Sequence, residues 1–211
     1  MTAASPVWRL GHAASPLAFV PRSLSSWQHR FDDPRREYRT LYCADQKLTC
    51  LREVLADLRP STEALRDFAR LFGDRRAIPA GVVSTEWRRA HALAPATITL
   101  LDGDLVDLDD LAVRRRLERR HAALLAAHAM PHLDISQVRS RDRVVTQTIS
   151  RALFEEGAAG IRFRSNLDDG PCAALFEGRA RLEPRGEPAS LTEDVEELLQ
   201  VVREYGLVLR Q

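Results

Sequence analysis

Three separated fragments of the chain hold the residues whose types could do chemistry together. The fragments are His29-Arg30-Phe31-Asp32, Thr40-Leu41-Tyr42-Cys43-Ala44-Asp45 with Leu51-Arg52-Glu53-Val54-Leu55-Ala56, and Gly160-Ile161-Arg162-Phe163-Arg164-Ser165. Arg30, and Arg9 before it, each stand beside an aromatic residue, and a guanidinium offers a planar fork of donors that holds phosphate or carboxylate in bidentate fashion. Taken alone, each arginine is also consistent with an ordinary surface ion pair.

Tyr42, Glu53 and Ser165 each admit a structural and a functional interpretation. Tyr42 points opposite to its neighbours in a predicted strand, so its ring either fills the core or stacks on a planar ligand. Glu53 lies among apolar residues of a predicted helix. Facing the sheet, its carboxylate would be partly desolvated and would need a partner, whereas facing solvent it would pair with Arg52 or with groups near Lys47. Ser165 ends a strand and lies in no Gly-x-Ser-x-Gly elbow, so we expect it to orient other groups by hydrogen bonds.

Short strands from both ends of the chain, with helices between them, must position these residues. Strands are predicted at residues 7–10, 40–44, 82–84, 97–101, 105–108, 160–164, 173–176, 180–183 and 207–209. Helices are predicted at residues 46–58, after Ser61, and at 109–131, 142–156 and 190–205. Leu48, Leu51, Leu55 and Leu58 recur at helical spacing, so the first helix should pack on a sheet. The pattern predicts an α+β fold with short-stranded central sheets and inserted helices.

Local signals predict where several of these helices begin and end. Asp45 is a plausible N-cap for the first helix, and Ser190 with Glu193 has the spacing of a capping box for the last. Asp109 and Asp110 open the long helix, where their charge suits the positive end of the helix dipole. Gly157 is expected to end the helix predicted at residues 142–156.

Length and composition predict one soluble domain. With 211 residues the chain can bury a substantial core. We expect a catalytic domain over residues 7–183 and a short C-terminal extension, 184–211, packed on the same domain. A net charge of +1 gives no overall attraction to nucleic acid or to an anionic membrane. The three cysteines, Cys43, Cys50 and Cys172, form no CxxC pair, so neither a disulfide framework nor a zinc site is indicated.

The predicted location is the cytoplasm. The N-terminal residues include Arg9 and several prolines, which leaves no apolar core for a signal peptide. No apolar run reaches the length that spans a bilayer, so we expect no membrane partner. Free thiols in a predicted strand and helix agree with a reducing compartment.

A set of five residues resembles the active site of the RES domain family, which is named for its Arg, Glu and Ser. In chain order they are Arg9, Arg30, Tyr42, Glu53 and Ser165. The resemblance extends over residues 7–183, and residues 165–176 look like the closing segment of the family. One departure is Asp32-Asp33-Pro34-Arg35, where the family often has asparagine and then a Pro-Gly pair.

The resemblance implies an ADP-ribosyltransferase-like fold that binds NAD in a cleft and breaks its nicotinamide–ribose bond. It further implies a toxin that depletes NAD by phosphorolysis, with inorganic phosphate, or by hydrolysis, and that is inhibited by an Xre-like antitoxin. In that scheme Glu53 stabilises an oxocarbenium-like sugar and Arg9 and Arg30 hold the pyrophosphate. Tyr42 would stack on the nicotinamide, and Ser165 would position the ribose. The resemblance implies no metal, and no direct contact of the toxin with nucleic acid.

Other features leave alternatives open. The stretch Arg114–Arg120 could bind nucleic acid or an acidic protein, or could be a solvated helix face, which the near-neutral net charge favours. His121, His128 and His132 suggest a metal set, but Pro131 separates the last two and no Glu-x-x-His spacing accompanies them. A third possibility is an ADP-ribosyltransferase that modifies a macromolecule. The sequence does not decide among phosphate, water and a macromolecule as the acceptor.

Overall fold

A curved, eight-stranded sheet forms the centre of the protein. The computed structural model describes residues 6–72, 81–140 and 142–210. In the sheet the strands follow the order β5-β6-β7-β2-β1-β4-β8, and β9 pairs with β4. Their bounds are β1 (Val7–His12), β2 (Thr40–Ala44), β4 (His91–Leu100), β5 (Leu105–Asp107), β6 (Gly160–Arg164), β7 (Pro171–Phe176), β8 (Ala180–Pro184) and β9 (Ala189–Ser190). The two N-terminal strands lie in the middle, between strands from later in the chain, which confirms the predicted mixing of the two ends.

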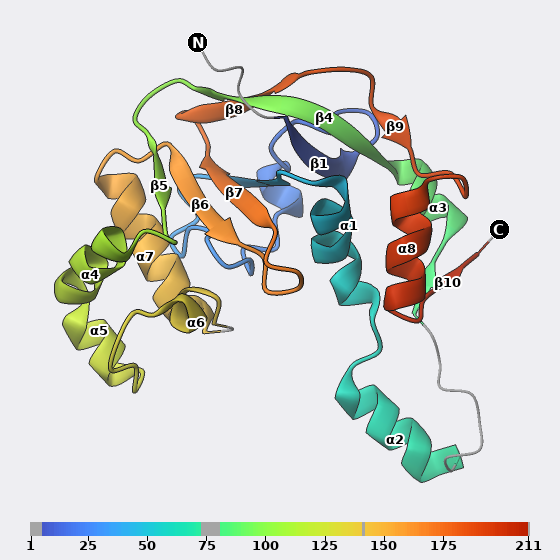
Figure 1. Cartoon of the computed structure of the whole chain (residues 1–211), viewed down its shortest axis with the longest axis horizontal. Helices are drawn as coiled ribbons and strands as arrows, with labels where there is room; N and C mark the ends of the chain where they lie inside the picture. Colours follow the sequence, from blue (N-terminus) through green and yellow to red (C-terminus); the bar gives the residue numbers. More distant parts are fainter. Residues whose placement is uncertain (1–5, 73–80, 141, 211) are drawn as a thin grey trace.

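The helices lie in two groups under the arch of this sheet (Figure 1). Their bounds are α1 (Lys47–Leu55), α2 (Thr62–Phe72), α3 (Thr85–Ala90), α4 (Leu111–Arg120), α5 (Ala122–Ala127), α6 (Ile135–Val138), α7 (Arg143–Glu155) and α8 (Glu196–Glu204). Helices α4 to α7 lie near β5 and β6, whereas α1, α3 and α8 lie at the other end of the arch, and α2 extends away below them. Two 3-10 turns, Arg22–Leu24 and Ala56–Leu58, complete the helical segments. The predicted α+β class is confirmed.

Side-chain caps confirm several predicted helix ends. Oδ1 of Asp110 accepts the N–H groups of Ala112 and Val113 at the start of α4. Asp142 caps α7 in the same way, through the N–H of Val144. After α7, Gly157 has a φ of +95°, a conformation that disfavours residues with a Cβ and therefore stops the helix.

Two predicted caps are wrong. The residue before α1 is Gln46, and the Asp45 carboxylate instead lies 4.0 Å from the guanidinium of Arg162. The proposed capping box at Ser190 fails because Ser190 belongs to β9, and α8 begins only at Glu196. In both cases a pairing with a segment distant in sequence replaces the local interaction.

Three element bounds also differ from the prediction. The predicted long helix divides at His121 into α4 and α5, each of which buries a leucine, Leu117 and Leu125. Strand β4 begins at His91, ahead of the predicted residue 97 and despite Pro95. The strand predicted at 82–84 is the two-residue β3 (Val82–Val83), since Ser84 caps α3, a helix that was not predicted. Tertiary burial and pairing, rather than local propensity, decide these bounds.

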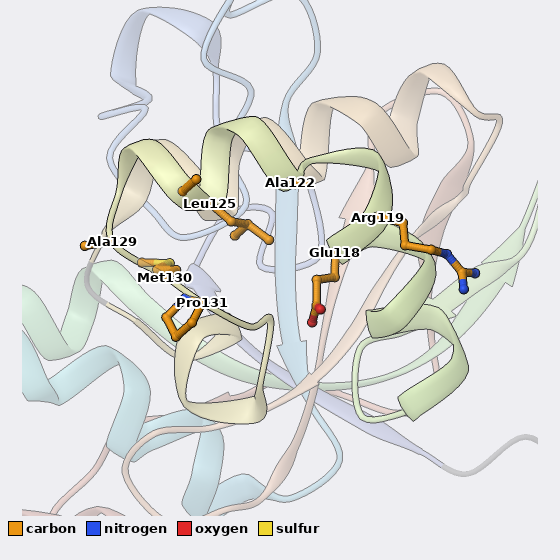
Figure 2. Close-up of a pocket in the computed structure, with 8 residues that line it drawn as sticks. Glu118, Arg119, Ala122, Leu125, Ala129, Met130 and Pro131 are labelled. Atoms are coloured by element: carbon orange, nitrogen blue, oxygen red, sulfur yellow. The ribbon is translucent and has the colours of Figure 1, made fainter.

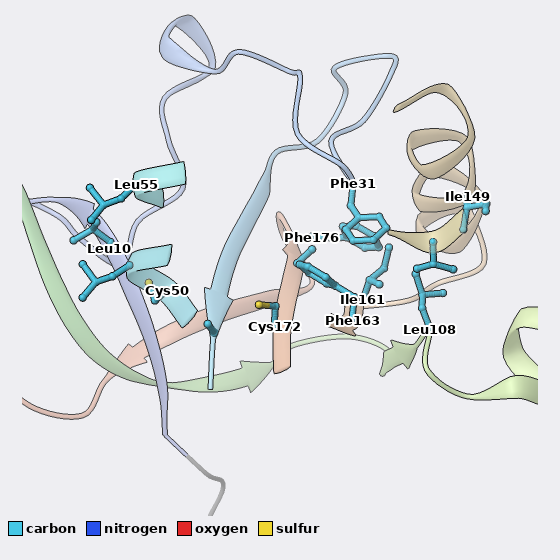
Figure 3. Close-up of a cluster of buried hydrophobic side chains, with 14 of the residues drawn as sticks. Leu10, Phe31, Cys50, Leu55, Leu108, Ile149, Ile161, Phe163, Cys172 and Phe176 are labelled. Atoms are coloured by element: carbon cyan, nitrogen blue, oxygen red, sulfur yellow. The ribbon is translucent and has the colours of Figure 1, made fainter. Parts of the chain in front are cut away.

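A hydrophobic cluster fills the inner side of the arch. It has two parts in Figure 3: Cys50 and Leu55 of α1 beside Leu10 of β1, and an aromatic part around Phe31, with Cys172 between them. Leu51 and Leu55 of α1 are fully buried, and Leu48 and Leu58 pack against the same cluster, which confirms that α1 packs on the sheet. Burial of each of these leucine side chains stabilises the folded state by about 1.5–3 kcal/mol. The three cysteines are buried and free.

The C-terminal segment pairs and packs with elements from the rest of the chain. Leu198 and Val201 of α8 are completely buried, and α8 packs against α1. The last strand, β10 (Val208–Leu209), pairs in parallel with β3. Gln211, the end of the extension expected from the sequence, lies outside the described residues.

The arginine-rich helix is only partly a solvated face. Arg114 is buried and donates to the carbonyl oxygens of Leu108 and Asp109 at 2.9 and 2.7 Å, so its expected place on an exposed face is wrong. Arg116 and Arg120 both pair with Glu156. In the described part of the chain no helix has the length and apolar character needed to cross a bilayer.

Candidate functional site

Hydrogen bonds and packing fix the segment that carries Arg30. The main-chain N–H of Phe31 donates to the Tyr42 hydroxyl at 2.9 Å, and that hydroxyl donates to Oδ1 of Asp32 at 3.1 Å. The Phe31 ring is fully buried and meets the Phe163 ring edge-on, with the centroids 4.9 Å apart. The main chain of Arg30 is therefore held beside β2 and β6.

The acidic pair in this loop stabilises its turn. Oδ2 of Asp32 accepts the N–H of His29 at 2.9 Å, which closes the turn around Arg30. Asp33 is completely buried, accepts the N–H of Glu37 at 2.6 Å and lies 3.3 Å from the guanidinium of Arg151. The residues that depart from the family pattern thus support the loop through their own hydrogen bonds.

Two nitrogen atoms of the Arg30 guanidinium have no partner among the described residues. The centre of the guanidinium lies 5.5 Å from the Phe163 ring and 5.9 Å from the Phe31 ring, while Nε and Nη1 are buried and find no hydrogen-bond acceptor in this part of the chain. Burial lowers the pKa of Arg30, the Glu53 carboxylate opposes this shift, and the positive charge of Arg143 adds to it. A buried donor without an acceptor is costly, which is typical of a site that a ligand completes.

Glu53 also carries a buried atom without a partner. Leu51 and Leu55, on either side of it in α1, are fully buried and orient the helix toward the sheet. Oε1 of Glu53 is buried and accepts no hydrogen bond from any residue that the structure describes. Of the two alternatives that the sequence left open, pairing with Arg52 is wrong, because Arg52 pairs with Asp168 and Glu204.

The sheet beneath these groups carries small side chains. Ala44 of β2 and Cys172 and Ala174 of β7 are buried and belong to the inner cluster. Burial raises the pKa of the Cys172 thiol, and the negative charge of Glu53 raises it further. The thiol therefore stays protonated and does not act as a nucleophile at neutral pH.

Ser165 organises a turn that contacts α1. Ser165 is completely buried, and its Oγ accepts the N–H of Leu167 at 3.0 Å. Asp168 accepts the N–H of Gly170 through Oδ1 and the Thr49 hydroxyl, at 2.8 Å, through Oδ2. A Cβ on Gly170 would lie 2.1 Å from Oγ1 of Thr49, so only glycine allows this close approach. The turn and the helix that carries Glu53 are thus held together.

Arg52 extends this contact to the C-terminal helix. Its guanidinium binds Asp168 at 2.9 Å and Glu204 of α8 through two hydrogen bonds of 2.9 and 2.7 Å. Burial alone would raise the pKa of Asp168, but hydrogen bonds from Arg52, the Gly170 N–H, Thr49 and Ser165 outweigh it and lower that pKa. Asp168 is therefore a charged junction between the turn, α1 and α8.

Replacing Asp168 with asparagine should lower the free energy of unfolding by about 1–3 kcal/mol at pH 7, because hydrogen bonds to a charged group are lost. The folded-state pKa of Asp168 is lowered, so its contribution is complete above the unfolded value of about 3.9 and disappears as pH falls below it. The difference between the wild type and Asp168→Asn should therefore shrink at acid pH. Urea denaturation at pH 7 and below pH 4 measures it.

Asp169→Asn is the matched control for this prediction. Asp169 is the next residue in the same turn, but its side chain is 64% exposed. We expect this change to stay within about 0.5 kcal/mol of the wild type. Equal losses from the two variants would show that Asp168 is no junction.

Arg9 lies behind the strand that carries Tyr42. Its Nη1 donates to the main-chain oxygen of Tyr42 at 2.8 Å, and its Nε donates to the oxygen of Pro16 at 2.9 Å. Gly11 allows this return of the loop, since a Cβ there would lie 2.2 Å from the Pro16 oxygen. Burial lowers the pKa of Arg9. The guanidinium bridges β1 and β2, which share a single registered pair, Trp8 with Ala44.

The structure thus brings most of the predicted residues together. Arg30, Glu53 and Tyr42 interact electrostatically around Cys172, and Ser165 joins them through the turn on α1, whereas Arg9 supports β2 from its backbone. Sequence reasoning missed the supporting set Asp32, Thr49, Arg52, Asp168, Arg143 and Cys172. The Asp-Asp-Gly turn after Ser165 was the one local signal for Asp168.

A shallow groove elsewhere on the protein is separate from this site. It has a volume of about 500 Å³ and lies along α4 and α5, between Glu118 and Arg119 at one end and Met130 and Pro131 at the other (Figure 2). Two nearby histidines face different carboxylates. Nδ1 of His128 lies 2.7 Å from Oδ2 of Asp142, and Nδ1 of His132 lies 3.5 Å from Oε1 of Glu118. In the described residues they form no common metal-binding group.

Comparisons with known proteins place the chain in a family. No curated protein matches the sequence. Among solved structures, a chain of the M. tuberculosis MbcT–MbcA toxin–antitoxin complex shares the fold, with a TM-score of 0.53 and 15% identity, over 96% of this chain and 89% of that one. The model of the RES domain matches residues 6–194. Because this match covers most of the 211 residues, the chain belongs to the RES domain family.

Proposed function

We propose that this protein is the toxin of a bacterial toxin–antitoxin pair and that it degrades NAD by cleaving the nicotinamide–ribose bond. The observation that carries the proposal is that two oppositely charged groups, which influence one another electrostatically, each hold buried polar atoms without a partner among the described residues: Nε and Nη1 of Arg30 and Oε1 of Glu53. RES family membership and the fold shared with a chain of a toxin–antitoxin complex support it. A cytoplasmic location follows from the substrate.

The chemistry needs few groups from the protein. When the C1′–N bond of NAD breaks, both bonding electrons pass to the pyridinium nitrogen, so nicotinamide leaves neutral without a proton. The ribose acquires oxocarbenium character, and a carboxylate at Glu53 stabilises that positive charge in a desolvated site. An oxygen of water or phosphate then bonds to C1′, and water gives up a proton in doing so. Arg30 would hold an anionic part of the substrate with its free fork.

The surrounding contacts assign the remaining residues supporting roles. The Tyr42 hydroxyl is already bonded to Asp32 and Phe31, and its pKa is raised, by burial most of all, so it stays a neutral phenol. Its ring, rather than its hydroxyl, is therefore the part that we propose meets the nicotinamide. Ser165 would orient the ribose side of the site through its turn. Nε and Nη1 of Arg9 already donate hydrogen bonds to main-chain oxygens. We therefore propose that Arg9 holds strand β2, which carries Tyr42, in place rather than binding pyrophosphate.

NAD loss by the purified protein tests the proposal. We expect free nicotinamide to appear with the decay of NAD, and the second product to be ADP-ribose in phosphate-free buffer or ADP-ribose 1″-phosphate when phosphate is the acceptor. Label from NAD found on a macromolecule would indicate an ADP-ribosyltransferase instead. Stable NAD in the presence of folded protein, with and without phosphate, would contradict the proposal.

Changing Arg30 to lysine should separate charge from geometry. Lysine keeps the positive charge but loses the planar fork, so KM for NAD should rise and kcat should fall, together lowering kcat/KM by about tenfold to a hundredfold. Steady-state assays of nicotinamide release measure both constants.

Arg115→Ala serves as the control, because Arg115 is an exposed arginine on the outer face of α4. Its turnover should match the wild type. Loss of activity in Arg115→Ala with none in Arg30→Lys would favour a module that binds nucleic acid or protein through the Arg114–Arg120 face. The structure gives that alternative little support, since Arg114 is buried and Arg116 and Arg120 are paired with Glu156.

A further inference from the structure

One face of α7 contacts the loop that carries Arg30. Nε2 of Gln147 donates to the main-chain oxygen of His29 at 2.9 Å. Oγ of the fully buried Ser150 donates to the main-chain oxygen of Phe31 at 2.7 Å. These two contacts flank Arg30 on the loop, so α7 runs alongside the backbone that positions its guanidinium.

Arg143 extends this face by one turn. It precedes Gln147 by four residues and Ser150 by seven, the spacing of side chains on a common helix face. This spacing places Arg143 on the side of α7 whose next turns contact His29 and Phe31. In agreement, its positive charge adds to burial in lowering the pKa of Arg30. The two arginines are therefore brought to the same side of the site by the packing of α7 against the loop that carries Arg30.

Within the described residues, nothing neutralises this pair fully. The Arg143 guanidinium makes a long hydrogen bond, 3.5 Å, to the main-chain oxygen of Ser140. The adjacent carboxylate of Asp142 is engaged elsewhere, by the N–H of Val144 and by His128. Glu53 compensates one positive charge, while Nε and Nη1 of Arg30 remain buried without acceptors. Two guanidinium groups with unused donors call for an anion with several oxygens.

We propose that Arg30 and Arg143 together form a binding site for a phosphate group. A tetrahedral phosphate offers oxygens in different directions and up to two negative charges, so it can bond to both forks, whereas one carboxylate would satisfy one. The inference rests on the proposed function for its two sources: inorganic phosphate as the acceptor, or the pyrophosphate of NAD. It identifies Arg143, which lies outside the sequence pattern of the family site, as a substrate-binding residue.

Direct binding tests the site independently of NAD cleavage. Calorimetric titrations with inorganic phosphate and with ADP should show binding of at least one to the wild-type chain. Arg143→Ala should weaken that binding about tenfold or more, the effect of one charge-assisted hydrogen bond, and Arg143→Lys should weaken it less. Arg115→Ala should bind as the wild type does. Circular dichroism and thermal unfolding establish that each variant is folded.

Turnover then separates the two sources. If the site takes inorganic phosphate, Arg143→Ala should raise KM for phosphate about tenfold and leave KM for NAD unchanged. If it takes the pyrophosphate, KM for NAD and the affinity for ADP should change together, with or without phosphate. Equal binding of phosphate and ADP by folded Arg143→Ala and wild type, or binding of neither by the wild type, would overturn the site. A protein that binds phosphate through Arg143 but spares NAD would instead refute only the proposed function.

Discussion

Replacing Glu53 with glutamine should lower NAD turnover by about 10²–10³-fold, the loss that follows removal of one electrostatic stabiliser from an active site. The substitution keeps the size of the side chain and its place between Leu51 and Leu55, so the fold of α1 is preserved. It removes the negative charge that would face the developing oxocarbenium. Because that charge acts in the transition state, kcat should fall far more than KM changes. Nicotinamide release under saturating NAD measures the loss.

The control for this experiment is Glu63→Gln on α2. The Glu63 side chain is 78% exposed and belongs to α2, which extends away from the sheet (Figure 1), so turnover should be unchanged. Wild-type turnover in a folded Glu53→Gln protein would remove Glu53 from the mechanism. Arg30 and Arg143 would then form an anion-binding site in which the Glu53 carboxylate has no part in catalysis.

Expression of the wild-type protein alone should arrest bacterial growth while cellular NAD falls. An enzyme that consumes free NAD depletes the cofactor of its own cell unless it is inhibited. Glu53→Gln, expressed at the same level, should permit normal growth. Colony counts and NAD extracted at intervals after induction measure both effects, and Glu63→Gln should remain as toxic as the wild type.

A cognate partner should reverse this arrest. We propose that an Xre-like antitoxin binds the protein and closes the site, most simply by placing a carboxylate against the unpaired nitrogens of Arg30. Co-expression should restore growth and yield a complex that survives gel filtration. Normal growth and steady NAD in cells that contain the folded protein without a partner would contradict the toxin proposal.

Much of the local structure could be predicted because its signals lie within a few residues. Strand β2 at 40–44, strand β6 at 160–164 and the caps Asp110 and Asp142 follow from apolar runs and nearby side chains. The failures at Asp45 and Ser190 have one cause. Each side chain or strand found a partner far along the chain, and no local pattern reports that choice.

For the candidate site, the sequence could predict only the types of the residues and their order along the chain. The sequence indicated Arg30, Tyr42 and Glu53. It did not indicate that the Tyr42 hydroxyl donates a hydrogen bond to Asp32, or that Arg9 donates hydrogen bonds to main-chain oxygens. Asp168 reaches Thr49 across 119 positions, a separation at which periodicity carries no information. The roles of such residues depend on which side of a strand faces the site, and therefore on the assembled sheet.

The link from the site to α8 has a consequence for how such a protein can change. The match to the RES domain ends at residue 194, yet Glu204 holds Arg52, which holds the turn that carries Ser165. Substitutions in this last helix would therefore shift the relative positions of Glu53 and Ser165 while every residue of the motif stays the same. A lineage could adjust the geometry of the site by altering a segment that lies outside the recognised domain.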